Sequence, residues 1–197
     1  MNKKISEIAD RIAELEQQLE RALTEELEAK RRKVLYVIER GRAAFTAEAR
    51  ALHQTARQGA WAFLWEAPVK TLLVAPVIYS VLIPLVLLDL WMSLYQAVCF
   101  PVYGIGRVVR ARYILLDRGQ LRYLNWIERT NCNYCGYANG VVAYTREIAA
   151  RTEQYFCPIK HAQRCAGMHS RYRGFLEFGD SEAYKKELAR LRADLKL

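Results

Sequence analysis

Hydrophobic and polar positions divide the chain into four parts, and an apolar stretch over residues 71–106 dominates the pattern. Only Asp89 interrupts this stretch, because 18 uncharged residues precede this carboxylate from residue 71 and 17 follow it to residue 106. A segment this long and this apolar is typical of a chain in contact with lipid. The pattern therefore predicts a membrane anchor over residues 68–106.

Two topologies are open for this anchor. A single span would run from about Lys70 to Trp91 and would leave the charged N-terminal part on the opposite side of the membrane. Pro76 and Pro84 can instead break the helical ladder, which favours a re-entrant hairpin that enters and leaves on one face. We expect the hairpin, with Asp89 near the interface, where it can reach water or an arginine.

Residues 1–67 predict a long N-terminal helical arm. A short heptad seam begins it, with intervals of three and four, at Ile5, Ile8, Ile12, Leu15 and Leu19. Two clean heptads are fewer than a self-standing coiled coil usually shows. The seam is therefore expected to pack on its own protein, or on a second copy as a homodimer. Helical character is expected to persist to Ala67, as one long helix or two abutting ones, because no proline precedes Pro68.

Charge is uneven along the chain. The net charge is +9, and the part from Arg107 onward contributes +8 of it with 17 basic and 9 acidic residues. Basic clusters beside a membrane segment usually face anionic lipid on the cytoplasmic side, so lipid is favoured over nucleic acid as the partner of this charge. The N-terminus shows no secretory signal. We expect the inner face of a membrane, with the C-terminal part in the cytoplasm.

Residues 107–179 predict a small basic head, and residues 180–197 predict an amphipathic C-terminal helix. In the head, residues 113–116 are β-like, Asp117 has the spacing of an N-cap, and a helix is expected over residues 118–130. A second helix is expected over residues 141–155. The C-terminal helix is capped by Asp180 and Ser181, and its apolar stripe is expected to pack on the N-terminal seam.

Cysteine and histidine in the head have the spacing of metal ligands. Cys132 and Cys135 form a C-x-x-C pair followed by Gly136, which relieves a tight turn, and the CPIKH segment supplies Cys157 and His161. Three thiolates and one imidazole suit a closed tetrahedral zinc site. Such a site would contribute folding energy directly to a head with little hydrophobic core. The spacing therefore predicts structural zinc.

Three other interpretations use the same residues. Cys165 could replace His161 as the fourth ligand of an iron–sulfur cluster. The C-x-x-C pair could be a redox dithiol, although the flanking sequence lacks a thioredoxin-like βαβ pattern. The thiols could also be unliganded. His169 lies in a basic loop and is expected to face solvent rather than bind metal, and Cys99 is expected to be a small apolar residue within the anchor.

Three segments carry a resemblance to a known family. They read IYSVLIPLVLLDLWMSLYQAVCFPVYGI, YLNWIERTNCNYCGYANG and REIAARTEQYFCPIKHA. Together they resemble a family of small, uncharacterised bacterial membrane proteins, and the similarity covers about residues 75–179. The resemblance implies a bacterial membrane location and adds no substrate. The N-terminal seam and the last helix are outside it.

These observations predict a mainly α-helical, membrane-anchored protein with a metal-stabilised head. No nucleotide-binding loop, Ser-His-Asp set or pair of catalytic acids is recognisable, and a saturated zinc site leaves no open position for chemistry. We therefore expect a non-enzymatic adaptor or assembly protein that binds a membrane protein partner. The alternative is a membrane-bound redox or metal-handling protein, with an iron–sulfur cluster or a dithiol.

Overall fold

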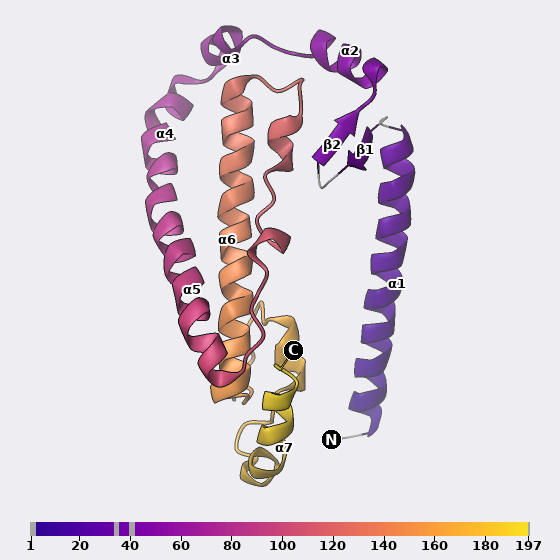
Figure 1. The fold of residues 1–197 in the computed structure, drawn as a ribbon, viewed down its shortest axis with the longest axis vertical. Coiled ribbons are helices and arrows are strands. Elements are labelled where there is room, and N and C mark those ends of the chain that lie inside the picture. Colours follow the sequence, from indigo (N-terminus) through magenta and orange to yellow (C-terminus); the bar gives the residue numbers. More distant parts are fainter. Residues whose placement is uncertain (1–2, 34–35, 40–41, 197) are drawn as a thin grey trace. The chain divides into compact units, whose positions relative to one another are not determined.

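The computed structural model describes residues 3–33, 36–39 and 42–196, and it confirms a mainly helical fold. The chain forms two compact units, Met1–Ala60 with Gln120–Trp126 and Trp61–Gly119 with Ile127–Leu197. The elements, shown in Figure 1, are α1 (Lys3–Lys33), β1 (Tyr36–Glu39), β2 (Arg42–Phe45), α2 (Ala47–Thr55), α3 (Ala60–Glu66), α4 (Val69–Ser80), α5 (Leu82–Tyr103), α6 (Trp126–Phe156) and α7 (Ser181–Ala193), with short 3-10 helices η1 (Arg110–Arg112), η2 (Asp117–Gln120) and η3 (Ser170–Gly174).

The N-terminal unit departs from the expected single long helix or pair of abutting helices. α1 is helical as expected, but the chain then forms two antiparallel strands, in which Tyr36 pairs with Phe45 and Glu39 with Arg42. β-branched and aromatic residues in β1 favour a strand. An analysis of helical propensity alone could not predict this hairpin. After it, α2 starts at a cap formed by Thr46, whose hydroxyl accepts the Ala49 N–H.

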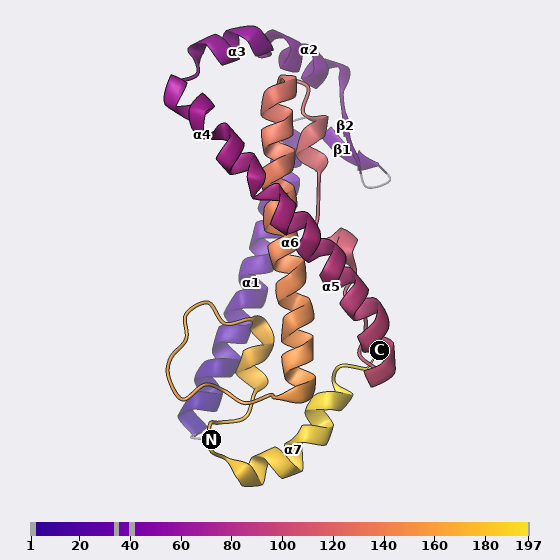
Figure 2. The same cartoon turned by 90° about the vertical axis from the view of Figure 1, so that its left-hand side faces the viewer.

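The anchor segment is a helix and not a hairpin. α4 and α5 are separated only by Val81, which itself has right-handed helical angles, and the two helices follow one bent path beside α6 (Figures 1 and 2). Pro84 stands in the first turn of α5, where no intrahelical N–H is needed, and Pro76 removes a single bond within α4. The prolines therefore bend the path without reversing it, and the expected re-entrant turn is absent from the described anchor.

The core of the second unit lies where α5, α6 and the end of α7 meet. It consists of Phe100, Ile105, Val108, Tyr144, Ile148 and Leu195. The expected cap of α7 is confirmed, because the Asp180 carboxylate accepts the Ala183 N–H at 2.8 Å. Leu195, the last residue of the expected α7 stripe, is buried in this core, and the expected pairing of that stripe with the N-terminal seam stays a prediction. Seam residues Ile12, Leu15 and Leu19 are exposed, and the side chains of Ile5 and Ile8 lie outside the described part of the chain.

Candidate functional site

The four predicted zinc ligands occupy two distant places. Cys132 and Cys135 lie inside α6, whereas Cys157 directly follows its last residue and His161 lies four residues further on. The 22 residues from Cys135 to Cys157 are almost entirely helical, and at about 1.5 Å per residue they separate the two pairs by about 33 Å. Zinc–ligand bonds are about 2.0–2.3 Å long. Binding by all four residues would therefore require α6 to break.

The remaining thiols do not complete a site either. Cys165 is exposed in the loop after Cys157, so an iron–sulfur cluster that used Cys132 and Cys135 would meet the same separation. Over the part of the chain that the structure describes, no three His, Cys, Asp or Glu side chains are grouped to hold a metal ion. The zinc-stabilised head expected from the spacing is thus not formed in this structure.

Gly136 has a different role from the expected relief of a turn. It lies in the middle of α6, and a Cβ at this position would be 3.2 Å from the Leu115 carbonyl oxygen. At Gly140, one turn later on the same face, a Cβ would be 2.8 Å from the Tyr113 oxygen. Residues 113–116, expected to be a short strand, instead run against these two glycines without strand pairing. The CGYANG motif is therefore a packing surface on a helix.

Asp89, the single charge of the apolar stretch, is buried and forms an ion pair with the half-exposed Arg110. It is 5% exposed, and Arg110 donates to both of its oxygens, from Nε at 2.9 Å and from Nη2 at 2.5 Å. The Tyr137 hydroxyl donates a third hydrogen bond at 2.9 Å. The expectation that Asp89 reaches an arginine is confirmed. Three donors neutralise and solvate a carboxylate that would otherwise disfavour an apolar setting.

Polar contacts continue along the face that α4 and α5 turn toward α6. The Tyr134 hydroxyl donates to the Ile78 carbonyl at 2.7 Å, and the Tyr144 hydroxyl bonds Gln96 and lies 3.2 Å from Ser93 Oγ. We call these contacts the tyrosine ladder, which consists of Tyr79–Asn131, Ile78–Tyr134, Asp89–Tyr137, Gln96–Tyr144 and Tyr95–Thr152. The ladder fixes which side of the apolar helix faces the protein.

The Gln96 side chain also binds the backbone of the segment that follows the anchor. Its amide oxygen accepts the Val108 N–H at 2.9 Å, and its amide nitrogen donates to the Val108 carbonyl at 3.3 Å. These bonds satisfy backbone groups that no regular element pairs. Sequence reasoning expected an arginine beside Asp89 without singling out Arg110, and it missed the contacts of Tyr137, Tyr144 and Gln96. The available signals were a lone carboxylate in an apolar run and tyrosines at helical spacing in a polar segment.

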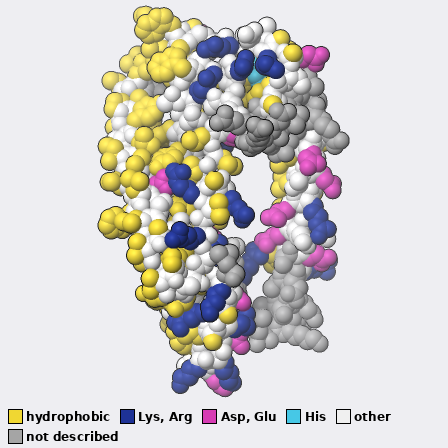
Figure 3. Space-filling view, viewed as in Figure 1, with side chains coloured by type: hydrophobic (Ala, Val, Ile, Leu, Met, Phe, Trp, Pro, Cys, Tyr) yellow, Lys and Arg dark blue, Asp and Glu magenta, His cyan; other side chains and the backbone are white. Residues whose placement is uncertain are grey.

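The opposite side of α4 and α5 is apolar and exposed. Figure 3 shows hydrophobic side chains gathered over these two helices. We define the outer stripe as Leu73, Leu87, Trp91, Leu94, Val98 and Val102, all of them exposed. At 100° per residue these six positions fall within an arc of about 80°. Taken as one helix, α4 and α5 cover Val69–Tyr103. Within the described part of the chain, this is the one helix that is long and apolar enough to cross a membrane.

A charged network holds the end of α6 to the loop that follows. Arg151 and Arg171 both donate to the Glu147 carboxylate at 2.9 Å, and Arg171 also donates to Gln154. Burial acts to raise the pKa of Glu147, but the hydrogen bonds from the two arginines outweigh it and hold that pKa below its ordinary value. The network stabilises the fold with Glu147 ionised.

The surroundings of His169 and His161 differ from those that the sequence predicted. His169 was expected to face solvent, but its side chain is 12% exposed, its Nε2 lies 2.8 Å from a Glu153 carboxylate oxygen, and its ring packs edge-on against Phe175. Aromatic side chains from later in the sequence shield the His169 ring from solvent. The spacing of residues along the sequence cannot reveal such contacts. His161 is exposed and stacks on Tyr172, whose hydroxyl accepts the His161 backbone N–H.

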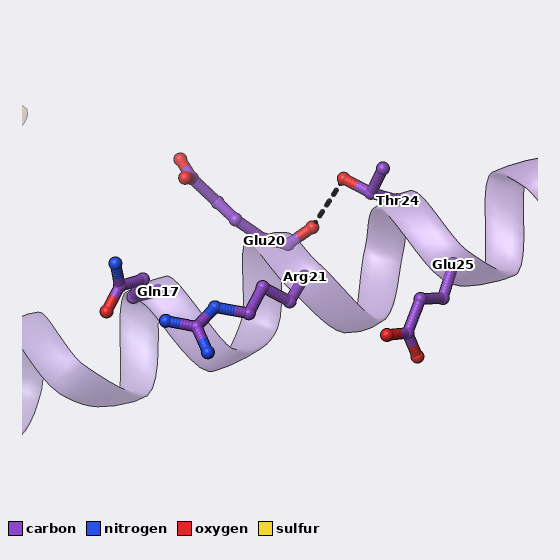
Figure 4. Close-up of a pocket in the computed structure, with 5 residues that line it drawn as sticks. All are labelled: Gln17, Glu20, Arg21, Thr24 and Glu25. Atoms are coloured by element: carbon purple, nitrogen blue, oxygen red, sulfur yellow. Dashed lines mark hydrogen bonds between the residues drawn. The ribbon is translucent and has the colours of Figure 1, made fainter.

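Comparisons with family models, curated proteins and solved structures found no match to this chain. The resemblance to bacterial membrane proteins thus stays a prediction, and the site must be judged on its own geometry. One surface hollow lies on α1, between side chains that splay outward from one helix: Gln17, Glu20, Arg21, Thr24 and Glu25 (Figure 4). A single helix cannot enclose a substrate, so this hollow is a solvated face.

Proposed function

We propose that the protein is a membrane-anchored adaptor or assembly protein without catalytic activity of its own. The observation that carries this proposal is the division of α4 and α5 into two faces. One face is hydrogen-bonded to α6 through the tyrosine ladder, and the other is the exposed outer stripe. An exposed apolar surface of this length is the mark of a lipid or protein contact. Lipid is favoured because the helix is also long enough for a membrane.

Charge supports the choice of anionic lipid and of the cytoplasmic side. Five arginines follow the anchor, at positions 107, 110, 112, 118 and 122. Arginines next to a membrane segment favour the cytoplasmic face and attract anionic headgroups. Together with the resemblance to small bacterial membrane proteins, this charge leads us to include the inner membrane of a bacterium in the proposal, with the head in the cytoplasm. Zinc has no part in it, because α6 keeps the two ligand pairs apart.

α1 supplies the surface for a protein partner. Leu15, Leu19, Leu23 and Leu27 are all exposed on a helix that is otherwise rich in charge. Their spacing of four residues keeps them on one side, although the row drifts slowly around a straight helix. A helix from a membrane protein partner, or α1 of a second copy, could cover this row. An anchor and a separate helical contact surface are the two parts that an adaptor requires.

Vesicle flotation tests the anchoring half of the proposal. The purified full chain, freed of detergent, is expected to float with vesicles that contain phosphatidylglycerol and to bind less well to pure phosphatidylcholine, because the arginines need anionic headgroups. Raising the salt concentration should weaken the binding to the anionic vesicles. If the chain stays at the bottom of the gradient with both kinds of vesicle, membrane anchoring is wrong.

The oligomeric state tests the contact surface of α1. If α1 pairs with a second copy, Leu19→Glu lowers the mass measured by light scattering in detergent from dimer to monomer. Gln17→Glu adds the same charge on the opposite side of the helix and is expected to leave the mass unchanged. A wild-type monomer would assign the leucine row to a different protein. Equal effects of the two variants would contradict a specific contact through the row.

A further inference from the structure

We infer that α4 and α5 lie in the plane of the membrane surface, with the outer stripe in the lipid and the tyrosine ladder toward water. This inference rests on the proposed membrane anchoring and specifies its geometry. It differs from both expected topologies, because the helix neither crosses the bilayer nor turns back within it. The partner that the outer stripe fits is the headgroup and upper acyl region of one leaflet.

Length is the first argument against a crossing helix. Val69–Tyr103 has 35 residues, which at about 1.5 Å per residue is about 52 Å of helix. The hydrocarbon core of a bilayer is about 30 Å thick. A helix apolar over its full length would have to tilt by about 55° to fit, whereas membrane helices tilt by about 0–40°. The outer stripe runs from Leu73 to Val102, and the exposed Ser80 on the same arc donates its hydroxyl to the Val77 carbonyl of its own helix.

The position of Arg110 is the second argument. Its partner Asp89 lies close to the middle of the 35 residues, so a crossing helix would carry the ion pair close to the midplane of the bilayer. The Arg110 side chain is 47% exposed, and the chain around it forms only a 3-10 turn, η1, followed by irregular backbone. Irregular backbone and a half-exposed guanidinium are strongly disfavoured against lipid tails.

An in-plane helix removes both conflicts. The Asp89–Arg110 pair and residues 113–116 lie on the side opposite the outer stripe, where water and headgroups can solvate them. Indole rings favour the headgroup level, and Trp91 in the stripe and Trp61 and Trp65 in α3 are all strongly exposed. Arg107 and Arg110, which follow α5, donate to the Ala97 carbonyl and to Asp89 and therefore lie beside the helix. The arrangement resembles that of a monotopic protein, except that α6, and not a charged face of α4 and α5 themselves, lies on the water side of the helix.

Depth measurements along the stripe test this geometry. Leu73, Leu87 and Val102 are replaced one at a time by cysteine in a full chain whose five native cysteines are changed to alanine, and each is labelled with an environment-sensitive fluorophore. Quenchers attached at different depths of the lipid then report the depth of each label. The in-plane helix predicts three equal, shallow depths of about 5–10 Å below the headgroups. Ala149→Cys, on an exposed position of α6, should report water.

The outcomes separate the inference from the proposal beneath it. A deep label at position 87 with shallow labels at 73 and 102 overturns the in-plane helix but keeps the membrane anchor. Failure of the wild-type chain to bind vesicles overturns both, and a dimer that binds no vesicles would assign the stripe to a second copy. The wild-type chain gives an independent readout. Trypsin added outside preformed vesicles should cut both α1 and α7, whereas a crossing helix would protect one of them.

Discussion

At the scale of residues, two glycines decide how closely the chain can pass along α6. Gly136 and Gly140 are four positions apart and therefore share one face of the helix. Residues 113–116 approach that face so closely that the backbone of Tyr113 and Ile114 would touch any side chain at position 140. The same close approach sets Arg110 beside Asp89. A small packing feature thus supports the ion pair of the anchor.

Gly140→Ala is expected to destabilise the second unit by about 1–3 kcal/mol, because the new methyl group meets backbone atoms that cannot turn aside. Gly174→Ala is the control, since a Cβ at Gly174 has no heavy atom within 4 Å and its φ is not positive. Chemical denaturation in detergent measures both variants. Equal stability of the two variants would show that residues 113–116 do not pack on α6.

Replacing Cys132 by serine is expected to change the free energy of unfolding by less than about 1 kcal/mol, because no metal site depends on this thiol in the structure. Limited proteolysis and metal analysis of the wild-type protein check this result. One bound zinc per chain, together with a protease-sensitive head in Cys132→Ser, would show that the four ligands do meet and that α6 is broken.

Glu147 makes the stability of the head depend on pH. Its pKa is lowered in the folded state, so the stability that it contributes is complete above its unfolded pKa of about 4.3 and is lost as the pH falls through the folded pKa. Glu147→Gln should lower the free energy of unfolding by about 1–2 kcal/mol at pH 7. The difference from wild type should shrink as the solution is acidified below about pH 4.

Denaturation curves at several pH values measure this difference. Glu182→Gln is the matched control, because Glu182 pairs with Lys186 on the exposed face of α7 and should contribute little at any pH. A Glu147→Gln curve parallel to that of wild type at every pH would mean that the carboxylate is not held by Arg151 and Arg171.

At the scale of elements, the sequence predicts the type of a secondary-structure element better than the course that the chain takes through it. The helices α1 and α7 and the cap at Asp180 follow from periodicity and capping residues, as does the apolar character of α4 and α5. The pattern could not show that Pro76 and Pro84 bend the anchor without reversing it, because a proline is tolerated wherever its missing N–H is not needed. It also could not show that C-x-x-C lies within a helix.

The candidate site was harder to predict for the same physical reason. Metal-ligand spacing is local, whereas the meeting of Cys135 and Cys157 depends on what the intervening residues form. The tyrosine ladder depends on which face of α6 meets the anchor, and hydroxyl partners such as Tyr137 and Tyr144 are invisible until that face is known. Only the lone carboxylate of Asp89 marked the position in advance.

If the anchor is one continuous helix, its length determines the distance between its two ends. Spin labels at Leu73→Cys and Val102→Cys are 29 residues apart, which in one helix corresponds to about 44 Å. Pulsed electron resonance of the doubly labelled chain in lipid should give a distance below about 44 Å, because the path bends, but well above that of a hairpin. A hairpin would bring the two labels within about 20 Å of each other, because its arms would lie side by side.

At the scale of the whole molecule, the account assigns the apolar helix a role that links fold to location. The anchor is part of the folded unit, because α6, the core around Phe100 and the Asp89–Arg110 pair all pack on its inner face. Membrane contact is then expected to position the head directly, because α6 packs on the anchor within the same unit. A partner held by α1 would be recruited to the membrane surface.

The outer stripe itself provides the most direct measurement, which is vesicle flotation of the full chain with two charges placed on it. Leu87→Asp with Trp91→Asp should lower the vesicle-bound fraction at least about tenfold, because two carboxylates would enter lipid. Ala143→Asp with Ala149→Asp adds the same charge on exposed positions of α6 and should change binding far less. Equal loss in both variants, or undiminished binding of the stripe variant, would contradict anchoring through α4 and α5.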